Sequence, residues 1–129
     1  MATWDDVRRL ALALPDTTEA TSYGSPAWKV AGKAFVWDRP LHTTDLEHLG
    51  DAAPDGPVLG VHVADEGVKE ALVVDEPDVF FTTPHFDGYA AVLIRLERID
   101  EEELAEVITE AWLLRAPKRV ARAFLDARS

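Results

Sequence analysis

The sequence predicts one α+β domain with two layers, an antiparallel sheet backed by helices. Three observations lead to this prediction. Apolar residues recur at helical spacing near both ends of the chain, and between these ends they alternate as in strands. Turn-forming residues join the predicted strands over distances too short for parallel crossovers. The length of 129 residues fits a single domain over residues 1–129, with no internal repeat or linker.

The first element is predicted to be a helix that begins after Thr3 and ends before Pro15. Thr3 is a good N-cap, and the two aspartates after Trp4 place negative charge in the first turn. The apolar face of this helix consists of Trp4, Val7, Leu10, Ala11 and Leu14. A strand is predicted over residues 18–23, and the following Gly-Ser-Pro interrupts the pattern.

A β-hairpin is predicted next, with its turn at residues 31–32, where glycine follows alanine. Trp28 and Val30 share one side of its first strand. We expect Phe35 and Trp37 to share one side of its second strand in the same way.

The rest of the chain is predicted to mix strands with helices. Thr44 is expected to cap one helical turn before Gly50. Strands are expected over 58–63, 79–82 and 91–96, with a short helix beginning at residue 65. Asp100 and Glu103 have the spacing of a capping box that opens a long helix. Pro117 either kinks this helix or starts another one.

Charge is distributed unevenly along the chain. The net charge is −11, yet residues 115–129 contain five basic residues and one acidic residue. Arg115, Lys118, Arg119 and Arg122 would form one stripe on a continuous helix, and such a stripe could contact the phosphates of DNA. The alternative is that these cations favour a helix C-terminus and pair with nearby acids. The acidic remainder of the chain disfavours anionic partners.

The loop over residues 82–89 is the most unusual segment, because it combines hydroxyl, imidazole, carboxylate and aromatic groups. A small-ligand or protein-binding site is predicted here from Tyr23, Trp28, Lys29, Thr83, His85 and Tyr89. The alternative is a turn anchored to the core by Phe86 and Tyr89. His85 and Asp87 are weak grounds for acid/base catalysis.

No known catalytic, metal or cofactor motif is present in the sequence. The absence of cysteine excludes disulfides, thiolate metal sites and cysteine nucleophiles. The four histidines match no standard metal spacing, so no metal or cofactor is expected. The N-terminus does not resemble a signal peptide, and apolar runs are far shorter than a membrane span, which favours a cytoplasmic protein.

Several short motifs, in this order and spacing, resemble the MmcQ/YjbR family of small bacterial proteins. They are Ala13-Leu14-Pro15, Ser22-Tyr23-Gly24-Ser25-Pro26-Ala27-Trp28, the segment from Phe80 to Tyr89, and Ala116-Pro117-Lys118-Arg119. The resemblance implies an antiparallel sheet backed by helices, with a topology similar to type III secretion chaperones. It also implies DNA binding, the usual label of the family, and no catalytic residues. We therefore expect a non-enzymatic binding protein, monomeric or homodimeric.

Overall fold

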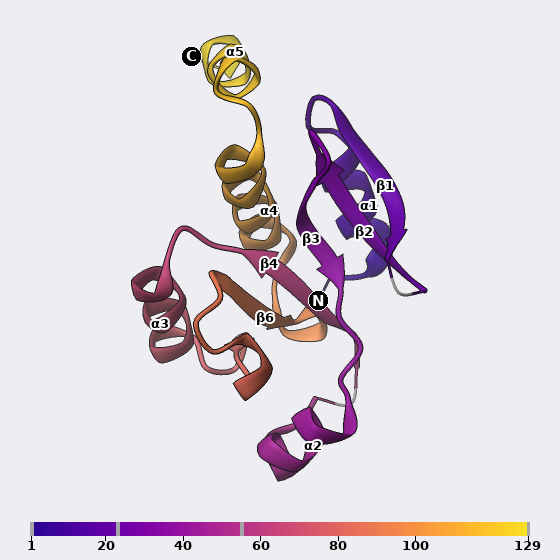
Figure 1. Ribbon diagram of the computed structural model, residues 1–129, viewed down its shortest axis with the longest axis vertical. Helices are drawn as coiled ribbons and strands as arrows, with labels where there is room; N and C mark the ends of the chain where they lie inside the picture. The colour runs from indigo at the N-terminus through magenta and orange to yellow at the C-terminus, as the bar shows by residue number, and fades with distance from the viewer. Residues whose placement is uncertain (1, 23, 55, 129) are drawn as a thin grey trace.

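The computed structural model describes residues 2–22, 24–54 and 56–128, and it shows five helices around one sheet (Figure 1). The helices are α1 (Trp4–Leu12), α2 (Thr43–Leu49), α3 (Glu66–Asp75), α4 (Glu101–Arg115) and α5 (Lys118–Arg128). The strands are β1 (Thr17–Ser22), β2 (Ser25–Val30), β3 (Lys33–Asp38), β4 (Val58–His62), β5 (Phe80–Phe81) and β6 (Ala91–Arg95).

The six strands form one antiparallel sheet in the order β1-β2-β3-β4-β6-β5. Short turns join β1 to β2 and β2 to β3, and the segment that carries α2 joins β3 to its neighbour β4. The segment that carries α3 crosses from β4 to the edge strand β5, and β6 then lies between these two strands, antiparallel to both. The predicted α+β class with an antiparallel sheet is confirmed. The turn between β2 and β3 has positive φ at both Ala31 and Gly32, as a tight hairpin turn requires.

The main core lies between the sheet and the layer formed by α1 and α4. Its largest side chains are fully buried and include Trp28 of β2, Phe35 of β3 and Trp112 of α4. Each contributes about 1.5–3 kcal/mol by removal from water. Val7, Ala11 and Leu14, from the apolar face predicted for the first helix, are buried in this core, so that prediction correctly identifies the core side of α1.

A second, smaller core lies on the other face of the sheet. Phe81 and Leu93 belong to it, whereas their chain neighbours Phe80 and Ile94 belong to the main core, as strand alternation requires. Leu41 and Leu49, from either end of the segment that carries α2, cover part of this cluster. This face is therefore partly covered near α2, in addition to the predicted helical layer on the opposite face.

The prediction that Phe35 and Trp37 share one side of β3 is wrong. The register of β2 and β3 shifts between Trp28 and Lys29, and Val36 rather than Phe35 lies opposite Trp28. A bulge of this kind inserts one residue and reverses the alternation that follows. Phe35 consequently packs in the main core and Trp37 against the second cluster, over Gly60, where a Cβ would lie 2.3 Å from the indole.

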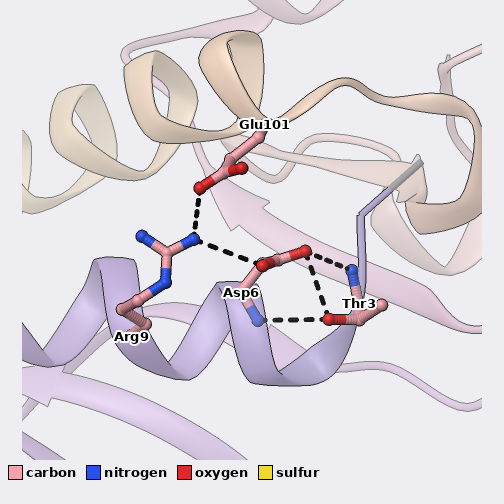
Figure 2. A network of polar contacts seen from close by, with 4 residues as sticks. All are labelled: Thr3, Asp6, Arg9 and Glu101. Atoms are coloured by element: carbon pink, nitrogen blue, oxygen red, sulfur yellow. Dashed lines mark hydrogen bonds and ion pairs between the residues drawn. The ribbon is translucent and has the colours of Figure 1, made fainter.

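A polar network fixes the start of α1 and ties it to α4 (Figure 2). The Thr3 hydroxyl accepts a hydrogen bond from the Asp6 N–H at 3.3 Å, and the Asp6 carboxylate accepts one from the Thr3 N–H at 3.0 Å. Arg9 then bridges Asp6 and Glu101, which lies in the first turn of α4. The predicted N-cap is confirmed, and its acidic residue also contacts the neighbouring helix through Arg9.

The predicted capping box at the start of α4 is only half present. The Asp100 carboxylate accepts a hydrogen bond from the Glu103 N–H at 2.7 Å, as predicted. The Glu103 side chain instead faces Glu76 at the end of α3. A hydrogen bond shared with Glu76, partial burial, and the charges of Glu76, Asp100 and Glu106 raise the pKa of Glu103 to about 7.

We expect Glu103→Gln to raise the free energy of unfolding by about 1–3 kcal/mol above pH 7, with little effect below pH 4.5. The folded-state pKa lies above the ordinary 4.5 of glutamate, so the stability linked to this proton is complete at acid pH. That stability is lost as the pH rises through the folded-state pKa of about 7. The glutamine variant has no proton to lose there, so its stability does not fall for this reason. Urea unfolding between pH 4 and 8.5 measures the difference.

The matched control is Glu102→Gln, which removes a charge from an exposed position in the same helical turn. It should leave the pH profile unchanged. If both variants flatten the profile equally, the general acidity of this turn is responsible and the contact with Glu76 is not.

Pro117 starts a new helix rather than kinking α4. Ala116 has extended backbone angles (φ −67°, ψ 146°), and α5 begins at Lys118. α5 projects from the end of α4, away from the sheet (Figure 1). Phe124 attaches it to the body through an edge-to-face contact with Trp112, with ring centroids 4.9 Å apart.

Candidate nucleic-acid interface and loop cluster

Three of the four predicted phosphate-binding cations lie together on α5. Lys118, Arg119 and Arg122 are exposed and occupy one side of the helix, at spacings of one, three and four residues. They line a shallow hollow together with Ala123 and Asp126. The arrangement places three positive charges within two turns at the N-terminal end of a helix, where backbone N–H groups also favour anions.

Arg115 does not join this group, because the chain does not continue as one helix beyond it. It is partly buried at the end of α4, and its Nε is buried without a hydrogen-bond partner among the described residues. Burial and the positive charge of Arg115 lower the pKa of His62, at the end of β4. Arg115 therefore lies close enough to β4 to act on His62 electrostatically.

One acidic residue lies close to the α5 cations, because Asp126 lines the same hollow as Lys118, Arg119 and Arg122. The ion pairs of the body of the protein involve other cations, namely Arg8, Arg9, Arg39 and Lys69. The alternative, that nearby acids neutralise the C-terminal cations, therefore stays a prediction.

Lys33 adds a fourth exposed cation at the same end of the molecule. It opens β3 directly after the turn at residues 31–32, and this turn and α5 lie toward the same end of the long axis (Figure 1). Lys33 was not among the predicted phosphate-binding cations, although its position next to a tight hairpin turn indicates that its side chain is exposed. We call Lys33, Lys118, Arg119 and Arg122 the basic end.

The residues predicted to form a ligand site do not come together. Trp28 is 1% exposed in the main core, where its Nε1 donates to Glu19 at 3.0 Å. Three strands separate β2, with Trp28 and Lys29, from β5, after which Thr83, His85 and Tyr89 follow. Tyr23 lies outside the described residues. Tyr89 is 64% exposed, so of the two predicted anchors of the loop only Phe86 is buried.

The loop instead covers a buried polar cluster that sequence reasoning missed. Arg39 and Asp45 are 7% and 1% exposed, and Nη2 of Arg39 donates to Oδ2 of Asp45 at 3.0 Å. The guanidinium also stacks over the Phe86 ring, 5.2 Å from its centroid. The His85 ring lies 4.9 Å from the Phe86 ring and 6.5 Å from the His42 ring, measured between centroids. Arg39 and Asp45 are only six residues apart, but no local pattern marks them as buried, because the loop covers them only when α2 packs against it.

Thr83 is the member of this cluster whose side chain lacks a hydrogen-bond partner among the described residues. It is 1% exposed, and its hydroxyl faces Asp45 without reaching hydrogen-bonding geometry with any described residue. Burial opposes the ionised form of Asp45, but the His42 N–H, the Thr83 hydroxyl and Arg39 together lower the pKa of this carboxyl. The cluster therefore holds a buried charge pair that orders residues 39–45 against the loop.

Lys69 fixes the far end of the same loop. It is 4% exposed, and its ammonium group donates to the carbonyl oxygens of Phe86 at 2.6 Å and Tyr89 at 3.2 Å. Glu66 lies 3.6 Å away and supplies the opposite charge. A buried lysine with these partners is explained by its structural role, since it satisfies two loop carbonyls.

Within the described ranges no three His, Asp or Glu side chains are grouped so that they could hold a metal ion. The helices found in those ranges are all too short or too polar to cross a membrane.

One protein family matches most of the chain. The YjbR family model matches residues 12–114 of this chain. The chain is 53% identical, over 128 residues and 97% of both sequences, to uncharacterized protein Mb2600 of Mycobacterium bovis and to uncharacterized protein Rv2570 of Mycobacterium tuberculosis. The family match ends at Leu114, so it does not include α5.

A solved structure supports the fold. The crystal structure of Deinococcus radiodurans protein DR2400, with its DUF419 domain, superimposes with a TM-score of 0.65 at 21% identity. The likeness covers 88% of this chain and 78% of that one. The motifs that resembled the family and the match over residues 12–114 lead to the same conclusion: this chain belongs to the YjbR family.

Proposed function

We propose that this chain binds nucleic acid through the phosphate backbone, using the basic end. The observation that carries the proposal is the set of exposed cations Lys118, Arg119 and Arg122 on one side of α5. Lysine and arginine grouped on one helix face release condensed counterions when they meet phosphates, and this release supplies most of non-specific affinity.

The acidity of the rest of the chain restricts how nucleic acid can approach. Residues 1–114 contain eight basic and 23 acidic residues, and the first turn of α4 alone carries three glutamates. The excess of acidic residues disfavours phosphate over most of the surface outside the basic end. The proposed contact is therefore end-on and small, and it favours backbone recognition without base reading.

The test is a titration of fluorescent duplex DNA by fluorescence anisotropy across salt concentrations. We expect binding at about 50 mM salt, with log K falling by about three to four units per tenfold rise in salt, as three or four phosphate contacts predict. Arg119→Glu should weaken binding at least about tenfold, because it replaces an attraction with a repulsion at the contact.

Arg98→Glu is the matched control, since it reverses an exposed arginine in a segment away from α5. It changes the net charge equally and should leave affinity within about twofold. No binding of duplex at about 50 mM salt with tens of micromolar protein would overturn the proposal. An equal loss of DNA affinity from Arg98→Glu and Arg119→Glu would show that net charge causes the effect and that α5 is not the binding site.

A further inference from the structure

The sheet has one face that the helical layer does not cover. α1 contacts β1 and β2, and α4 contacts β3 and β4, on the side of the main core. On the other side, the second cluster occupies the part of the sheet formed by β4, β5 and β6. Strand pairing and alternation identify the side chains that point away from the helical layer on the first three strands. We call them the open face: Thr18, Ala20, Ala27, Lys29, Ala34 and Trp37.

Trp37 lies in a row of small residues that runs across this face. The row consists of Ala20, Ala27, Trp37 and Gly60, which are neighbours on β1, β2, β3 and β4. The indole lies over Gly60, and on its other side the two alanines leave about 10 Å, two strand spacings, without a large side chain. Trp37 is partly exposed, so an aromatic ring is accessible beside a flat surface.

The open face carries no acidic residue, although residues 1–114 contain 23 of them. The sequences of β1–β4 include two, Glu19 and Asp38, and both lie on the helical side. Glu19 accepts a hydrogen bond from Trp28 at 3.0 Å, and Asp38 lies opposite Leu59 of the main core. Lys29 therefore supplies the charge of the open face, which favours an anionic partner there.

The open face also continues toward the basic end. Lys29 pairs with Ala34, next to Lys33 at the start of β3. The hairpin turn at residues 31–32 lies toward the same end of the molecule as α5 (Figure 1). A polyanion held at the basic end can therefore extend past Lys33 and Lys29 to Trp37 without meeting an acidic side chain of the open face.

We propose that a single strand of DNA lies on the open face, with an unpaired base stacked on Trp37 and phosphates at Lys29 and the basic end. The inference rests on the proposed function and adds which form of nucleic acid is bound. An accessible aromatic ring beside cations binds single strands of any sequence, because every base has a flat face. Bases inside a duplex are already stacked and cannot use the ring.

The neighbours of Trp37 favour DNA over RNA. Ala27 and Gly60, on either side of it in the row, have no side chain that could form a hydrogen bond with a 2′-hydroxyl. Proteins distinguish RNA from DNA through this hydroxyl. A strand that lacks it therefore loses no contact beside the indole.

Tryptophan fluorescence tests whether a base reaches Trp37. Trp28 and Trp112 are 1% and 0% exposed, which leaves Trp37 and the partly buried Trp4 of the helical layer to respond to a ligand. We expect an oligothymidine of about 15 nucleotides to quench the fluorescence. Trp37→Phe should remove most of this quenching, whereas the matched control Trp4→Phe should retain it.

Affinity measured across salt concentrations separates stacking from charge. Trp37→Leu should weaken oligothymidine binding at least about fivefold and duplex binding by less than about twofold. It should leave the salt dependence unchanged, since stacking releases no counterions, whereas Lys29→Gln should reduce the slope by about 0.7. Trp37→Phe keeps a ring and should bind within about threefold of the wild type. Circular dichroism checks that each variant is folded.

The outcomes distinguish this inference from the proposed function. If neither single-stranded nor duplex DNA binds at about 50 mM salt, both fail. If duplex binds through Arg119 but Trp37→Leu leaves the affinity for oligothymidine unchanged, or weakens both forms equally, the proposed function stands and this inference is overturned. Oligouridine that binds at least about tenfold more tightly than oligothymidine would overturn the assignment to DNA.

Discussion

Arg39→Met is expected to lower the free energy of unfolding at pH 7 by about 3–5 kcal/mol, because it leaves the Asp45 carboxylate buried and unpaired. Asp45 is 1% exposed, and Arg39 is its charged partner at 3.0 Å. Methionine keeps much of the side-chain length that packs against Phe86, so the loss of stability comes mainly from the missing charge. Urea unfolding followed by circular dichroism gives the value.

The loss should depend on pH in a definite direction. In the folded protein the pKa of Asp45 is held below its ordinary value, so the stability linked to this carboxylate is present above the unfolded pKa and disappears as the pH falls through the folded value. Removing Arg39 raises the pKa of Asp45. The difference between the wild type and Arg39→Met should therefore shrink at acid pH, where protonation removes the buried charge.

Arg39→Met combined with Asp45→Asn separates charge from packing. Asparagine keeps an oxygen that can accept the His42 N–H, which donates to Asp45 at 2.9 Å. The double variant should recover most of the stability lost by Arg39→Met, because neither charge is then buried alone. If the double variant is as unstable as Arg39→Met, the loss comes from packing around Phe86 and the ion pair is not its cause.

The fold class was predictable because local patterns and tertiary packing agree. Helical spacing at both ends and alternation between them identified the strands and the buried faces of α1 and α4. The error at Phe35 and Trp37 has a physical cause, since one inserted residue in β3 reverses the alternation. No residue in that segment marks the insertion, because both faces of the strand meet apolar neighbours.

The polar sites were less predictable because they depend on contacts between distant segments. Glu103 matched a local capping rule, but its side chain interacts instead with Glu76, the residue that follows α3. Arg39 and Asp45 stand in a segment of irregular sequence, where charges are usually solvated. Trp28 was predicted to join the loop in one binding site because it is aromatic, yet three strands of the sheet lie between β2, which carries Trp28, and β5, which precedes the loop. The α5 cations were found because their spacing within one helix is a local property.

Trp112 joins the core to the projecting helix. The side chain is 0% exposed, and its Nε1 donates to the carbonyl oxygen of Pro15 at 3.0 Å, which links α4 to the connection between α1 and β1. On its other side the indole meets Phe124 of α5. Val120 and Phe124 of α5 pack against the main core.

Trp112→Ala should therefore cost about 3–5 kcal/mol, a large part of the 5–15 kcal/mol typical of a domain, because it opens a cavity that the neighbours only partly fill. Trp112→Phe keeps an aromatic ring near Phe124 but leaves the Pro15 carbonyl without its donor, and it should cost about 1–3 kcal/mol. Urea unfolding measures both losses of stability.

Limited proteolysis measures how firmly α5 is held against the body of the protein. Cleavage near residue 117 should rise sharply for Trp112→Ala and little for Trp112→Phe, since only alanine removes the ring that docks Phe124. Equal cleavage of the two variants would show that the indole does not hold α5 in place.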